Sequence, residues 1–285
     1  MKNTTNTIDW VLTNHRNLEI LGNTDHPDSD PIACLVLLHG FKGYKDYGFI
    51  PVLAKALASQ GILVHRFNFS TSGMTNEIDT FTRPDLFALD TWSRQVEDVR
   101  CVFNAICSNT LPGKNLPLFL AGHSRGGATT LLTAGRDSSL NLSGIITINA
   151  VDRCCGLDEQ TKEQLLRTGS MTTPSARTGQ TLPINATWLQ EQLDDPAAHD
   201  VLKLCTTLRC PSLIMQGTDD PGIDIPTGQR IADAIGTDLH KIKGANHVLN
   251  MPNPAPIDGD MSPQLREVYE QTYKFVIANH AKTPI

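Results

Sequence analysis

Short apolar runs recur along the chain at intervals that suit the strands of a buried sheet. The clearest is Ala33–Leu38, which is apolar at every position. Continuous runs of this kind are typical of strands that are covered on both faces, because a half-exposed strand would alternate apolar and polar residues. Similar runs are Ile62–Phe67, Leu118–Ala121, Gly144–Ile148, Ser212–Gln216 and the shorter Leu239–Ile242.

Between these runs, apolar residues return at helical spacing. The segments 49–57, 96–106 and 231–235 each place an apolar residue at every third or fourth position. Buried strands that alternate with amphipathic helices favour a parallel sheet with helices on both faces. We therefore predict an α/β fold with a doubly wound, mostly parallel sheet, and a ligand site at the carboxyl ends of the strands.

One long segment interrupts this alternation. From Val151 to about Leu208 no strand-like run appears, whereas Asp158–Leu166 and Trp188–Leu193 are compatible with helices. We expect one domain over residues 1–285, with a helical cap inserted at about 151–208 over the active site. An ordinary long loop with helices is the alternative, and it would remove the segment's role in substrate choice.

Composition and charge narrow the class of protein. Hydrophobic residues make up 40% of the chain and charged residues 19%, as in ordinary globular proteins. The net charge of −6 argues against nucleic acid as a partner, and no apolar run approaches the length of a membrane span. The first residues lack the apolar centre of a secretory signal, so we expect a cytoplasmic protein with reduced thiols. The oligomeric state is left open.

The segment Gly122–Gly126, with the sequence Gly-His-Ser-Arg-Gly, carries the clearest chemical signal. It follows a predicted strand and precedes a small-residue segment that suits a helix. A strand, a sharp turn and a helix form the nucleophile elbow, in which Ser124 would stand clear of the sheet edge. This pattern predicts Ser124 as a nucleophile.

A serine hydroxyl needs a base to accept its proton and a carboxylate to orient that base. In the order typical of this elbow, both partners follow the serine. The acid is expected at Asp219 or Asp220, just after a late strand, and His247 follows the next strand. Asp-Pro turns and loop histidines are common one by one, but their occurrence together in the required order is not.

At these motifs the chain resembles the α/β-hydrolase superfamily, in particular its small serine esterases with an insertion after the sixth strand. The resemblance covers the chain from about Cys34 to His280. It rests on four motifs, which are Leu38–Gly43, Gly122–Gly127, Gly217–Asp220 and Gly244–His247.

The resemblance implies roles for further residues. The family's acid usually lies three residues after the glycine, which selects Asp220, with Asp219 as the alternative. The family's oxyanion hole implies the backbone N–H groups of Phe41 and Arg125. Two features stay open. The Arg125 side chain would pair either with a carboxylate of the protein or with one of the substrate. The 68–74 loop either borders the active site or is an ordinary polar connection.

The remaining histidines near these motifs have structural interpretations. His39 precedes the oxyanion turn and is expected to support its backbone. His123 lies beside the nucleophile, but strand alternation points it away. His65 lies on an apolar strand and is expected to be a core histidine with satisfied hydrogen bonds.

These observations predict a serine hydrolase that cleaves a small-molecule carboxylic ester through an acyl-enzyme, with Ser124, His247 and Asp220 as its triad. No cofactor and no metal ion are implied. Two alternatives remain: a peptidase or amidase with the same triad, and a non-catalytic ligand-binding protein on a hydrolase fold. Because the base must be neutral, we expect kcat/KM to fall on the acidic side of about pH 6–7.

Overall fold

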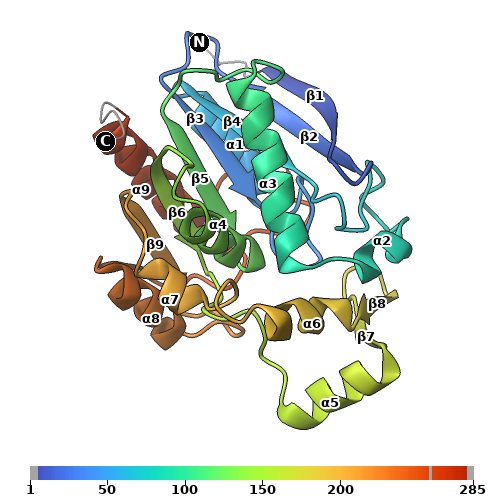
Figure 1. Ribbon diagram of the computed structural model, residues 1–285. Coiled ribbons are helices and arrows are strands. Elements are labelled where there is room, and N and C mark those ends of the chain that lie inside the picture. The colour runs from blue at the N-terminus through green and yellow to red at the C-terminus, as the bar shows by residue number, and fades with distance from the viewer. Residues whose placement is uncertain (1–5, 257–258, 281–285) are drawn as a thin grey trace.

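The computed structural model describes residues 6–256 and 259–280, which form an eight-stranded sheet with helices on both faces (Figure 1). The strand order is β1-β2-β4-β3-β5-β6-β9-β10. The six strands from β4 to β10 run parallel, whereas β2 pairs antiparallel with both β1 and β4. The strands are β1 (Asn6–Thr13), β2 (Glu19–His26), β3 (Ala33–Leu38), β4 (Ile62–Phe67), β5 (Leu118–His123), β6 (Leu142–Ile148), β9 (Ser212–Gly217) and β10 (Leu239–Ile242).

The predicted doubly wound, mostly parallel sheet is confirmed. Strand β3 shows why the apolar runs are continuous, since Cys34, Val36 and Leu38 face one buried layer while Leu35 and Leu37 face the other. The first layer is covered by α3, α4 and α8, and the second by α1 and α9. These helices are α1 (Ile50–Ala58), α3 (Trp92–Cys107), α4 (Arg125–Arg136), α8 (Ile225–Ile235) and α9 (Pro263–Asn279). A short helix, α2 (Pro84–Ala88), precedes α3.

Between β6 and β9, the chain leaves the sheet and forms a separate group of elements near the carboxyl ends of the strands (Figure 1). They are α5 (Glu159–Thr168), β7 (Ser170–Pro174), β8 (Thr181–Asn185) and α6 (Thr187–Asp194). Helix α7 (Val201–Cys205) follows them and packs against α4 and α8 in the first layer. Helices α5 and α6 lie where the sequence indicates helices. The segment thus has the position expected of a cap.

Strands β7 and β8 differ from the expectation that this segment contains no strand. They form a two-stranded antiparallel sheet of their own among the described residues. Each strand has only five residues and contains a proline, Pro174 or Pro183, so neither carries the apolar run that marks a buried strand. The N-terminal pair β1–β2 was not predicted either, because β1 lies at the sheet edge and alternates between exposed and half-buried residues.

Candidate active site

Ser124 lies in the turn between β5 and α4, at the carboxyl edge of the sheet. Its backbone has φ 55° and ψ −121°, a conformation that is strained for a residue with a side chain. The turn is tight because glycine flanks it: a Cβ added to Gly122 would lie 2.1 Å from the Gly126 carbonyl oxygen. The Ser124 amide donates to the Ile148 carbonyl at 2.9 Å, which ties the turn to the neighbouring strand. This is the geometry of a nucleophile elbow.

The imidazole of His247 lies between Ser124 and Asp220. Its Nε2 atom is 3.0 Å from Ser124 Oγ, and its Nδ1 atom is 2.6 Å from Asp220 Oδ2. His247 stands in the loop after β10, and Asp220 in the turn after β9, so the carboxyl ends of neighbouring strands bring the three groups together. The arrangement allows a proton to pass between the serine hydroxyl and the ring while the carboxylate orients the ring.

Asp220, and not Asp219, faces the imidazole. The carboxylate of Asp219 instead accepts from the Thr218 hydroxyl at 2.8 Å. Burial acts to raise the pKa of Asp220, but the hydrogen bonds from His247 and from the Gly222 and Ile223 amides outweigh it and hold that pKa below its usual value. The Asp220 carboxylate is therefore ionised at neutral pH.

The turn of Gly40 and Phe41 lies against the nucleophile, since a Cβ added to Gly40 would be 3.0 Å from Ser124 Cβ. Among the residues that the structure describes, neither the Phe41 nor the Arg125 amide N–H has a hydrogen-bond acceptor. Arg125 opens α4, where backbone N–H groups lack partners within the helix. Two unpaired donors at this place suit an oxyanion.

The neighbouring histidines, His39 and His123, form hydrogen bonds with backbone groups around the site. His39 Nδ1 is 2.8 Å from the Gly40 carbonyl oxygen, and the Phe69 amide donates to its Nε2 at 3.3 Å. Burial lowers the pKa of His39 to about 4 and that of His123 to about 3, so both rings are neutral at working pH. His123 Nε2 lies 2.7 Å from the carbonyl oxygen of His247, away from the serine hydroxyl.

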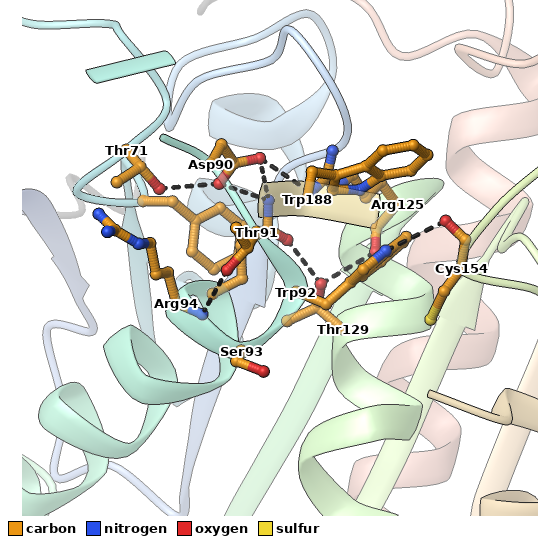
Figure 2. A network of polar contacts seen from close by, with 12 residues as sticks. Thr71, Asp90, Thr91, Trp92, Ser93, Arg94, Arg125, Thr129, Cys154 and Trp188 are labelled. Atoms are coloured by element: carbon orange, nitrogen blue, oxygen red, sulfur yellow. Dashed lines mark hydrogen bonds and ion pairs between the residues drawn. The ribbon is translucent and has the colours of Figure 1, made fainter. Parts of the chain in front are cut away.

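The Arg125 side chain forms an ion pair inside the protein (Figure 2). Its Nη2 atom is 2.9 Å from Asp90 Oδ2, and its guanidinium group lies 4.5 Å from the centre of the Trp92 ring and 5.3 Å from that of Phe41. Asp90 also accepts from the Thr71 hydroxyl at 2.8 Å. Arg125 therefore meets a protein carboxylate.

A cavity of about 710 Å³ opens beside Ser124 and Arg125. Part of its wall comes from the 151–208 segment, including Trp188 on α6. Its apolar lining residues include Phe41, Phe87, Trp92, Met171, Ile184 and Trp188, and its polar and charged lining residues include Asp152, Arg153, Asp224, Thr227 and Arg230. The 68–74 loop contributes no residue to this wall within the described chain. Such a wall suits a largely apolar small molecule.

Three residues of this region carry no specific signal in the sequence. Asp90 and Trp188 come from segments without a motif, and each meets the site only through the tertiary fold. Asn149, which directly follows β6, donates to the carbonyl oxygen of His247 at 2.9 Å. Its position after a buried strand, at the edge where ligand sites form, is the signal by which it could have been noticed.

Within residues 6–256 and 259–280, no group of three or more His, Cys, Asp or Glu side chains is placed to hold a metal ion. In the same residues, no helix combines the length and apolarity needed to cross a bilayer.

The sheet and the elbow together define the α/β-hydrolase fold, and solved structures agree. Est1E from Butyrivibrio proteoclasticus superposes with a TM-score of 0.67, at 15% identity over 96% of this chain and 99% of its own. The α/β hydrolase GrgF from Penicillium sp. sh18 gives 0.72 at 17% identity, over 97% and 100%. An acylaminoacyl peptidase from Pyrococcus horikoshii gives 0.64 at 13% identity, over 99% of this chain and 43% of that one.

The sequence profile of the serine aminopeptidase S33 family matches residues 29–201, more than half of the chain. The chain belongs to this family, and with it to the α/β-hydrolase superfamily that its motifs resemble. It is accordingly a serine hydrolase by family. No curated protein matches the sequence.

Proposed function

We propose that this protein hydrolyses carboxylic esters through an acyl-enzyme formed on Ser124. The observation that carries the proposal is the place of the His247 ring, 3.0 Å from Ser124 Oγ and 2.6 Å from Asp220 Oδ2. A base within hydrogen-bond reach of the serine, itself oriented by a buried carboxylate, is the arrangement that nucleophilic catalysis by serine requires.

The chemistry follows from these positions. Ser124 Oγ attacks the ester carbonyl and passes its proton to His247 Nε2, while Asp220 stabilises the imidazolium. The amides of Phe41 and Arg125 stabilise the negative charge on the tetrahedral intermediate, and each such donor contributes about 2.7–4 kcal/mol. The alcohol leaves with the proton from His247. Water then repeats the sequence, which releases the carboxylic acid and restores Ser124.

The 151–208 segment acts as a cap within a single domain that spans residues 1–285. Its residues Met171, Ile184 and Trp188 share the cavity wall with Ser124. Because this part of the wall is apolar and aromatic, the substrate is a small-molecule ester whose acyl or alcohol part is apolar.

The experiment is a panel of p-nitrophenyl esters with increasing acyl length, measured on the wild-type enzyme and on Ser124→Ala. We expect the wild type to turn over the esters and kcat/KM to fall by at least about 10³-fold in the variant, because Ser124→Ala has no nucleophile. Equal rates in the two proteins would contradict it. A fluorophosphonate probe that leaves Ser124 unmodified would favour a non-catalytic binding protein instead.

A peptidase is the second candidate, and the description of the family as serine aminopeptidases favours it. An aminopeptidase binds the free α-ammonium group of its substrate, which calls for an unpaired carboxylate near the nucleophile. In the described part of the cavity wall, Asp90 is paired with Arg125, and Asp152 with both Arg153 and Arg230.

The last two carboxylates of the described wall differ in their partners. Asp220 holds His247, and Asp224 accepts from the Thr227 amide and hydroxyl at the start of α8. Three of the four carboxylates are thus paired with an arginine or with His247, which favours an ester over a peptide substrate, whereas Asp224 is hydrogen-bonded to neutral groups only. Matched substrates test it: 3-phenylpropanoyl p-nitrophenyl ester against phenylalanine p-nitroanilide. A higher kcat/KM for the anilide would favour the aminopeptidase.

A further inference from the structure

Asn149 lies where the segments that carry the acid and the base approach each other. It directly follows β6, it is fully buried, and its φ of 49° is in the left-handed region, which asparagine tolerates better than most residues. Its amide N–H donates to the Met215 carbonyl on β9 at 2.9 Å. The backbone of Asn149 is therefore fixed to the strand that leads to Asp220.

The side-chain amide of Asn149 joins two loops. Its Oδ1 atom accepts from the Gly217 amide at 2.7 Å, at the end of β9. Its Nδ2 atom donates to the carbonyl oxygens of His247 at 2.9 Å and Asn246 at 3.3 Å. One buried amide thus connects the segment before Asp220 to the loop of His247.

His123 supplies a second donor to the same oxygen. Its Nε2 atom lies 2.7 Å from the His247 carbonyl oxygen, which can only accept, so the hydrogen is assigned to Nε2. Burial keeps the ring neutral by lowering the pKa of His123 to about 3. The rings of His123 and His247 are 4.8 Å apart, where a second positive charge would oppose formation of the His247 imidazolium.

We propose that Asn149 and His123 are positioning residues that fix His247 against Ser124 by saturating its carbonyl oxygen with two hydrogen bonds. This inference rests on the proposed function, in which His247 is the base. A backbone held from two directions cannot carry the ring away from the serine hydroxyl, and a displacement of about 1 Å in such a group can cost about 100-fold in rate. Within the described chain, neither residue lines the cavity.

Asn149→Gly tests the amide, because glycine keeps the left-handed backbone without strain. His123→Phe tests the second donor while retaining a ring against Phe49, whose centre lies 5.1 Å away. We expect kcat to fall by about 10- to 100-fold in each variant, with KM within twofold of wild type. Labelling of Ser124 by a fluorophosphonate should slow by a similar factor. The downfield proton resonance of the His247–Asp220 hydrogen bond should shift or broaden.

Asn14→Gly is the matched control. Asn14 is another buried asparagine whose amide links distant segments, to Ser70 Oγ at 3.1 Å and Asp98 Oδ1 at 2.8 Å, but it makes no contact with the triad. The Asn14→Gly variant should be less stable than the wild type, while its kcat per folded molecule stays at the wild-type value.

Wild-type kcat per folded molecule in both Asn149→Gly and His123→Phe would overturn the positioning role. A rise in KM at constant kcat would also overturn it. Failure of wild-type Ser124 to react with the probe would instead count against the proposed function. In that case, the downfield resonance still decides the positioning role: an unchanged resonance in both variants contradicts it.

Discussion

The guanidinium of Arg125 lies 2.9 Å from the carboxylate of Asp90, so the residue after the nucleophile is held by an ion pair within the cavity wall. Both side chains are almost completely buried. Burial raises the pKa of Asp90 and the charge of Arg125 opposes that rise, so each partner compensates the desolvation of the other.

Removing one partner of this ion pair should lower the stability of the folded protein. Asp90→Asn leaves the Arg125 charge buried without compensation, and we expect the free energy of unfolding to fall by about 3–5 kcal/mol. The double variant Asp90→Asn/Arg125→Met should lose less than the sum of the two single changes, because it removes the charge as well as its partner. Urea unfolding of the four proteins measures this coupling, and strict additivity would show that the ion pair is not coupled.

The two neighbouring aspartates in the turn after β9 provide a matched test of the acid. Asp220→Asn should lower kcat by about 10⁴-fold, because an amide no longer holds the His247 ring in the required tautomer. Asp219→Asn should stay near wild type, since its carboxylate contacts Thr218 and not the ring. Steady-state kinetics on one ester decide between them, and a larger loss in Asp219→Asn would reverse the assignment.

Stability should depend on pH through the buried histidine of β4. Burial lowers the pKa of His65 to about 4, below the value of roughly 6.5 for an unfolded chain. Between these values the unfolded state binds more protons, so the stabilisation is complete above about pH 6.5 and is lost as the pH falls toward 4.

His65→Asn removes this group on β4, where the ring contacts Thr24 and Pro112. Urea unfolding between pH 4 and 7 should show a weaker pH dependence in the variant, by up to about 1.4 kcal/mol per pH unit. Parallel curves for wild type and variant would contradict the assignment of a low pKa to His65.

Substrate size should govern affinity. The apolar wall that includes Phe87, Ile184 and Trp188 removes acyl methylenes from water. If this burial is realised, KM should fall by up to about fourfold for each added CH₂ until the chain fills the cavity. A series from acetate to octanoate measures the trend, and a KM that does not change with chain length would contradict this use of the cavity.

Much of the sheet could be predicted from the sequence, because a strand buried on both faces leaves a continuous apolar run such as Ala33–Leu38. The elbow is equally local, since its glycines and strained serine are neighbours in the chain. Edge and cap elements are harder to predict: β1, β7 and β8 are partly exposed and paired with single partners, and β7 and β8 have only five residues each.

Partners distant in the sequence could not be predicted from local patterns. The sequence left the Arg125 side chain open because Asp90 lies in a loop with no motif and meets it only in the folded chain. The choice between Asp219 and Asp220 likewise depends on side-chain direction in one turn, which adjacent residues of the same type do not reveal. The family's spacing favoured Asp220, and the structure places that residue against His247.

Formation of an acyl-enzyme on Ser124 is tested by intact-mass spectrometry of the enzyme quenched during turnover of a slowly deacylated ester, followed by peptide mapping. We expect a mass increase equal to the acyl group, located on Ser124 and missing in Ser124→Ala. Turnover without an acyl adduct on Ser124, or an adduct on another residue, would contradict it.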